Sequence, residues 1–347
     1  MRSKLKKSKK EELKMKTMRK STLFLTFSCF LLTYFFIQPV RVNFAQEMYP
    51  TRPIKYIGPT AAGGIIDVSS RKIAFLAAQY LGQEIIVENK PGAGTMLSAS
   101  YIAKAKPDGY TIGAVTSAVI VIHPFFAKDK MDFDPIADFT PIVQFVEFNQ
   151  ALGVPINSPI KSFQEFLEEG RKRQIIIGGV GMTSAETAVQ RLSLETKIKY
   201  KIVPFGGSAP TVMAAMGGQV DAFVCSGTSE FARAGKIKII ARLNGEPKKG
   251  VYKEIPTLKE LGYDIEAVSF AGICGPKGLP EHIKKKLEEA FTRALEDPSV
   301  EQLIHNIGDN FRFRNSKDYT NYIKEVYKRT DKDMKELGLG IYAKDKK

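Results

Sequence analysis

Apolar runs of strand length alternate with amphipathic stretches along most of the chain after residue 48. The runs are rich in β-branched residues, and the stretches between them repeat their apolar positions at helical spacing. Strands are predicted at residues 54–57, 85–88, 111–115, 144–148, 175–178, 201–203, 221–224, 238–241 and 267–273. Helices are predicted at residues 67–80, 95–103, 162–169, 184–196, 209–216, 281–296 and 316–335, with Asp67 capping the first. This alternation is typical of α/β proteins with mainly parallel sheets.

The pattern contains no internal repeat and no long Gly/Ser linker. A second domain would therefore not be a separate unit joined to the first by a flexible linker. About 300 residues are enough for two lobes. If there are two, the chain crosses between them more than once, with candidate crossings near residues 148–154 and 270–275. We therefore expect one lobe at residues 49–150, a second at 151–270, and a return to the first at 271–340, where the C-terminal helix braces it.

The first 45 residues have the pattern of an export signal. Ten Lys or Arg residues up to Lys20 precede an uncharged apolar run that extends to Val40. The apolar core of about 15 residues is short for a membrane-spanning helix, which favours a cleaved signal over a retained anchor. Cys29 offers lipidation as an alternative, although the residues before it lack the usual leucine.

Without residues 1–45, the net charge and the cysteine content exclude few classes of function. Residues 1–45 hold 11 of the 52 Lys and Arg residues and 2 of the 37 acidic ones, so the remainder carries 41 minus 35, or +6. The basic balance therefore does not indicate nucleic acid, although a mild positive field could steer an anion. Cys225 and Cys274 remain, and their spacing does not show whether they are buried free thiols or form a disulfide.

Two glycine-rich loops lie between a predicted strand and a predicted helix. The first loop, residues 59–67, contains Gly63 and Gly64, and the second loop, residues 178–184, contains Gly181, Thr183 and Ser184. Glycines free the backbone N–H groups, and a helix N-terminus favours negative charge, so each loop could seat a carboxylate. An ordinary tight turn explains the same residues. Two further turns of this kind, at residues 89–95 and 205–210, strengthen the case for a cleft at the carboxyl ends of strands.

Residues for catalysis or metal binding are scarce. The three histidines are His123, His282 and His305, and no metalloprotease, nucleophile-elbow or dithiol motif occurs. We predict no catalytic residue, no metal site and no cofactor. A secreted enzyme with Asp67 or Glu186 as its base is a competing hypothesis.

Eight short motifs resemble, in order, those of the Bug (TctC-like) family of periplasmic receptors, the binding components of tripartite tricarboxylate transporters. The resemblance as a whole covers residues 49–337, nearly the whole chain beyond the signal, and its motifs lie between Tyr49 and Leu258. They are Tyr49-Pro50-Thr51-Arg52-Pro53-Ile54, Ala62-Gly63-Gly64 with Asp67, Val87-Glu88-Asn89-Lys90-Pro91-Gly92-Ala93-Gly94, Pro107-Asp108-Gly109-Tyr110-Thr111, Asp138-Phe139-Thr140-Pro141, Gly207-Ser208-Ala209-Pro210, Gly217-Gly218-Gln219-Val220-Asp221 and Ile255-Pro256-Thr257-Leu258.

The resemblance implies a two-lobed periplasmic binding fold of the type II kind, which closes on a ligand between its lobes. It implies that backbone amides, hydroxyls and waters hold a small carboxylate, with Asp67 ordering the first loop. The residues expected to bind the ligand are Thr60, Gly63, Gly64, Asp67, Thr116, Ser117, Gly181, Thr183, Ser184, Phe205, Ser226 and Phe270. Thr60, Glu186 and Cys225 depart from the family pattern and leave the ligand's identity open.

The resemblance further implies a receptor outside the cytoplasmic membrane that serves the permease subunits of such a transporter. We also expect a monomer, and from the charge balance no nucleic-acid partner. A sensory module that presents the same fold to a membrane signalling partner remains an alternative, which the sequence does not separate from transport.

Overall fold

The computed structural model describes residues 15, 49–181, 183–245 and 250–343, and from Tyr49 onward the chain forms one compact unit. The expected export segment, residues 1–45, lies outside the described residues except for Met15. Among the described residues, no helix has the length and apolar character needed to cross a membrane.

The first lobe is built on a six-stranded mixed sheet with the order β11-β4-β10-β3-β1-β2. Strand β1 runs parallel to β2 and β3, whereas β10 is antiparallel to both of its neighbours and β11 is antiparallel to β4. The strands are β1 (Ile54–Gly58), β2 (Ile85–Asn89), β3 (Thr111–Thr116), β4 (Phe139–Glu147), β10 (Phe270–Pro276) and β11 (Asn310–Arg314).

The second lobe has a five-stranded sheet with the order β7-β6-β8-β5-β9. Strand β6 is parallel to β7 and β8, and β5 is antiparallel to β8 and β9. The strands are β5 (Ala151–Pro155), β6 (Ile175–Gly179), β7 (Tyr200–Pro204), β8 (Ala222–Cys225) and β9 (Ile237–Arg242). The two-lobed α/β fold is confirmed, but the expectation of mainly parallel sheets is wrong. Strands β5 and β10 each begin directly after a crossing between the lobes, and each runs antiparallel to both of its neighbours.

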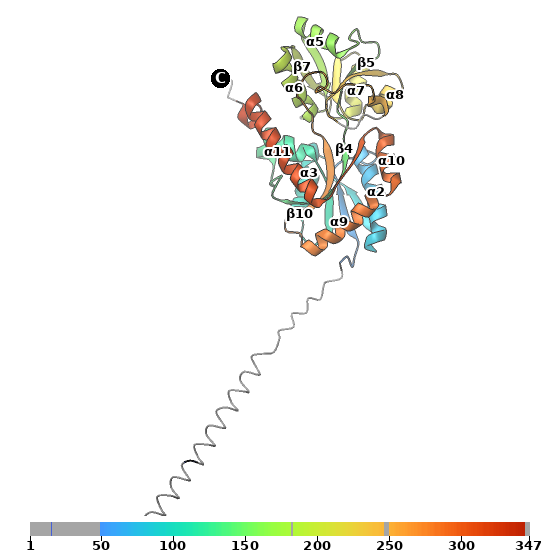
Figure 1. Ribbon diagram of the computed structural model, residues 1–347, viewed down its shortest axis with the longest axis vertical. Helices are drawn as coiled ribbons and strands as arrows, with labels where there is room; N and C mark the ends of the chain where they lie inside the picture. The colour runs from blue at the N-terminus through green and yellow to red at the C-terminus, as the bar shows by residue number, and fades with distance from the viewer. Residues whose placement is uncertain (1–14, 16–48, 182, 246–249, 344–347) are drawn as a thin grey trace, which may run out of the picture. The chain divides into compact units, whose positions relative to one another are not determined.

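Eight helices of at least eight residues are described, and α9 and α2 lie side by side on the first lobe (Figure 1). All seven predicted helices are present. The eight are α2 (Ile65–Leu81), α3 (Met96–Ala103), α5 (Phe163–Lys172), α6 (Ser184–Thr196), α7 (Ser208–Met216), α9 (Glu281–Leu295), α10 (Pro298–Ile307) and α11 (Ser316–Leu337). Shorter elements include α4 (His123–Phe126), α8 (Ser229–Arg233) and the π-helix η2 (Ala118–Ile122).

The chain passes between the sheets at residues 148–150 and again shortly before Phe270. Ala267 still packs in the core of the second lobe, whereas Val268 and Phe270 pack in that of the first. The two passages are joined by the Phe148 N–H, which donates to the Ser269 carbonyl at 2.9 Å. Asn244, which follows β9, accepts the Gln150 N–H at 3.0 Å and donates to the Phe148 carbonyl at 3.0 Å. Helix α11 packs on the first lobe, where Tyr319 meets the Phe270 ring edge-on at 5.9 Å.

The two cysteines that the structure describes are free and buried in different lobes. Cys225 packs with the core of the second lobe and Cys274 with that of the first, so the disulfide alternative is wrong. Burial raises the pKa of each thiol to about 12, which keeps both of them protonated at neutral pH.

Candidate functional site

Asp67 organises the first loop through its carboxylate. The side chain is only 3% exposed, and its Oδ2 accepts the Gly63 N–H at 2.8 Å. Its Oδ1 accepts Arg71 Nε at 2.9 Å and Asn89 Nδ2 at 2.8 Å. Helix α2 begins two residues earlier than predicted and is capped by Gly64, so Asp67 orders the loop from inside the helix instead of capping it.

The electrostatics of Asp67 agree with this structural arrangement. Burial raises its pKa, but the bonds from Gly63 and Asn89 and the charge of Arg71 outweigh burial and lower the pKa below its ordinary value. The carboxylate is therefore charged at neutral pH and is already bonded to three donors. Such a group holds a loop in place and is poorly suited to remove a proton from a bound acid.

A capping box orders the second loop. Glu186, which is 7% exposed, accepts the N–H groups of Gly181 at 2.7 Å and Thr183 at 3.1 Å. Thr183 Oγ1 in turn accepts the Glu186 N–H, and Ser184 is the first residue of α6. Glu186 thus plays the part in this loop that Asp67 plays in the first. Met182 lies outside the described residues.

Helices α2 and α7 begin at glycines, which provide no side-chain oxygen to accept their first N–H groups. Gly64 and Gly207 are the N-cap residues, and neither helix has a side-chain cap. Side chains cap α5 by Ser162, α10 by Asp297 and α11 by Asn315, whereas α3 and α9 have no side-chain cap either. The uncapped N–H groups of α2 and α7 are available to an anionic ligand.

The loops of the two lobes approach each other at Gly227. A Cβ atom built on this glycine would lie 3.9 Å from the Ile65 side chain of α2 and 3.9 Å from the Ser208 side chain of α7. Ile65 at the start of α2 and Ser208 at the start of α7 therefore both lie beside Gly227. Ser226, directly after β8, is half-buried beside Gly227.

The hydroxyl pair at the end of β3 makes bonds within the first lobe. Thr116 Oγ1 lies 2.8 Å from Thr95 Oγ1, and Ser117 Oγ accepts the Phe270 N–H at 3.1 Å. Both residues are buried. Thr60 Oγ1 is also buried but has no hydrogen-bond partner among the described residues.

The two aromatic residues expected as walls of the cleft have different environments. Phe205 is half-buried against the apolar cluster around Val212 and Cys225 in the second lobe. Phe270 is fully buried between Tyr319 and Tyr322, so it supports the first lobe from within.

The sequence did not identify three residues that hold the loops together, namely Asn89, Arg71 and Thr95. Arg71 follows Asp67 at the i,i+4 spacing of a helical ion pair, which was a readable signal. Asn89 and Thr95 reach their partners only because β2 and β3 both flank β1 in the sheet, and the chain order does not give that arrangement.

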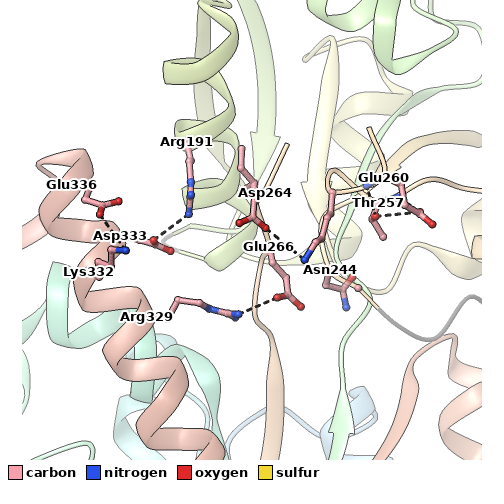
Figure 2. Close-up of a pocket in the computed structure, with 13 residues that line it drawn as sticks. Arg191, Asn244, Thr257, Glu260, Asp264, Glu266, Arg329, Lys332, Asp333 and Glu336 are labelled. Carbon is pink, nitrogen blue, oxygen red and sulfur yellow. Dashed lines mark hydrogen bonds and ion pairs between the residues drawn. The ribbon is translucent and has the colours of Figure 1, made fainter. Parts of the chain in front are cut away.

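A cavity of about 680 Å³ lies between α6, residues 244–245 and 257–266, and α11 (Figure 2). Figure 2 shows Arg191 pointing toward Asp333 and Arg329 toward Glu266, at 3.1 and 3.3 Å. Lys332 and Lys259 likewise face acidic partners, Glu336 and Asp264. Since each of these cations has an acidic partner, this cavity suits an anion less well than the uncapped helix starts. Among the described residues, no group of three or more His, Cys, Asp or Glu side chains could hold a metal ion.

A model of the family described as "Tripartite tricarboxylate transporter family receptor" matches residues 69–339. A UPF0065 protein encoded in the gbd 5′ region of Cupriavidus necator is 30% identical over 297 residues, covering 84% of this chain and 90% of that relative. The periplasmic binding protein BugD has a similar structure, with a TM-score of 0.73, 25% identity, and coverage of 84% of this chain and 99% of BugD. Malate-bound MatC from Rhodopseudomonas palustris has a TM-score of 0.70 at 28% identity and covers 82% and 99%.

Proposed function

This chain belongs to the receptors of the tripartite tricarboxylate transporter family, and we propose that it captures a small carboxylate between its lobes and delivers it to membrane permease subunits. The observation that carries the proposal is that the glycine-capped starts of α2 and α7 both lie beside Gly227, one from each lobe. Unpaired N–H groups at helix starts suit a carboxylate and need no Arg side chain.

Further support comes from the other loops and from one relative. The second loop presents Gly181, Thr183 and Ser184 at the start of α6, and Ser226 lies beside Gly227. MatC is described with bound malate, a dicarboxylate. We therefore place this chain's ligand among di- and tricarboxylates, acidic amino acids and related acids.

The proposed site has no turnover, because both carboxylates that could serve as bases are already in use. Asp67 and Glu186 each bond to backbone N–H groups and hold the loops. We further propose that the protein works as a monomer outside the cytoplasmic membrane, consistent with the basic and apolar pattern of residues 1–45.

Replacing Gly64 with valine tests the site. Gly64 has a φ of −71°, which valine tolerates, and a Cβ atom would lie 3.4 Å from its nearest neighbours. We expect Gly64→Val to weaken the binding of acids that stabilise the wild type by tenfold or more, because the branched side chain blocks close approach to the start of α2. The binding is measured by thermal-shift titration with dicarboxylates, tricarboxylates and acidic amino acids.

Gly217→Val is the matched control. Gly217 also has a negative φ and would also place a Cβ atom 3.4 Å from its nearest neighbour, but it lies at the far end of α7. The control should bind as the wild type does. If Gly64→Val binds equally well, the first loop is not part of the site.

A further inference from the structure

The turn at residues 92–95, between β2 and α3, has a strained backbone. Four consecutive residues have positive φ values, which are 141° at Gly92, 47° at Ala93, 63° at Gly94 and 76° at Thr95. Residues other than glycine rarely adopt this region, and two of the four carry a Cβ atom. A backbone of this kind persists only where its surroundings hold it, and strain of this type concentrates at binding sites.

The two ends of the segment that contains this turn hold two different ligand loops. At the beginning, Asn89 Nδ2 donates to Asp67 at 2.8 Å, and Asp67 orders the first loop. At the end, Thr95 Oγ1 lies 2.8 Å from Thr116 Oγ1, next to Ser117. The segment from residue 89 to 95 thus links the first loop with the loop that follows β3.

His123 packs directly against the middle of the turn. Its Nε2 lies 2.8 Å from the Gly94 carbonyl oxygen, and the side chain is only 3% exposed. A Cβ atom at Gly94 would come within 2.8 Å of the imidazole ring, so the two residues leave no space between them. The carbonyl can only accept, so Nε2 carries the hydrogen. Nδ1 is buried without a partner, and burial lowers the pKa, both of which agree with a neutral ring.

We propose that His123 is a positioning residue that holds the turn at residues 92–95 and, through it, keeps the first loop and the Thr116–Ser117 pair aligned for the ligand. The inference rests on the proposed function. His123 itself lies beneath the turn and acts through Gly94, and no ligand contact is assigned to it.

Two substitutions at His123 separate positioning from packing. Phenylalanine fills the same space but cannot donate to the Gly94 carbonyl, whereas glutamine can place an amide nitrogen where Nε2 lies. With L-malate and citrate as probes, we expect His123→Phe to weaken binding at least fivefold and His123→Gln to stay within about twofold of the wild type. Phe125→Leu is the control, because Phe125 is buried in the same helix but packs against Tyr327. It should lower the melting temperature without changing the affinity.

Hydrogen exchange gives a readout that needs no ligand. His123→Phe should speed exchange in peptides that cover residues 90–98 and leave those of β6 unchanged. Gly94→Ala should also speed exchange at residues 90–98, because its Cβ atom pushes the turn away from His123 and alanine is strained at this φ. It replaces His123→Phe as the test if that variant does not fold.

The results separate this inference from the proposed function. If no acid binds the wild type, the proposed function fails, and exchange alone decides the role of His123. Unchanged exchange at residues 90–98 overturns the inference. The inference is also overturned if every variant, Phe125→Leu included, loses affinity in proportion to its loss of melting temperature.

Discussion

Two buried carboxyl groups in this protein, those of Asp67 and Asp309, differ in how many hydrogen-bond donors they accept from. Asp67 accepts three hydrogen bonds and has a lowered pKa. Asp309 is 2% exposed at the contact between the lobes, where Oδ1 accepts the Asn149 N–H at 2.9 Å and Oδ2 has no partner. Burial raises the pKa of Asp309 to about 7 against the lowering effect of the Asn149 N–H. The same residue type is thus an anion at neutral pH at one position, whereas at the other it keeps its proton up to about pH 7.

The raised pKa of Asp309 predicts a stability that falls as the pH rises. The folded protein keeps the proton up to about pH 7, whereas the unfolded chain releases it near pH 4, so the contribution is fully present below pH 4 and is lost as the pH rises to about 7. Between pH 5 and pH 8, urea unfolding should show the wild type losing about 2 kcal/mol more than Asp309→Asn. Equal pH slopes in the two proteins would show that the fold does not perturb this carboxyl.

At the scale of elements, the sequence pattern predicted most helices and strands, because their apolar spacing is local. It missed β5, β11, α10 and the short helices α4 and α8. Strand β5 contains Gly153 and Pro155, so its sequence is typical of a loop between the lobes. In the structure, the Phe223 side chain of β8 packs where a Cβ atom of Gly153 would lie. Strand β11 lies at the edge of its sheet, where only β4 supports it.

Part of the site could also be predicted at this scale. Both glycine loops lie at helix starts as expected, since their glycines and hydroxyls are readable in the chain. The bonds of Asn89 to Asp67 and of Thr95 to Thr116 were not predictable, because they depend on the order of the strands.

The contact between β10 and α11 depends on a glycine. A Cβ atom at Gly272 would lie 2.5 Å from the Tyr319 ring, which is fully buried. Gly272→Ala should therefore lower the free energy of unfolding by about 1–3 kcal/mol, because α11 must shift away from the sheet. Chemical denaturation measures the change. Gly275→Ala in the same strand meets only the flexible end of Leu279 at 3.4 Å and should cost clearly less. Equal losses would contradict this account of the packing.

At the scale of the whole receptor, contacts beside the two chain crossings connect the lobes. Gly308 packs so closely against Ser229 that a Cβ atom would lie 1.8 Å from its hydroxyl oxygen, and Ser229 donates to the Ile307 carbonyl at 3.1 Å. The Arg191–Asp333 and Arg329–Glu266 pairs add links between the second lobe and α11, but they are partly exposed. Pairs of that kind contribute about 0–1 kcal/mol each, so packing at the crossings dominates the connection.

The most direct test of the central claim is a calorimetric titration of the chain from Gln46 onward with L-malate, citrate, glutamate and related acids, followed by recovery of the acid. The account predicts saturable binding of one such acid at one site per chain and recovery of that acid chemically unchanged. Binding of none of them, or conversion of the acid to a product, would contradict the claim that this protein is a carboxylate receptor.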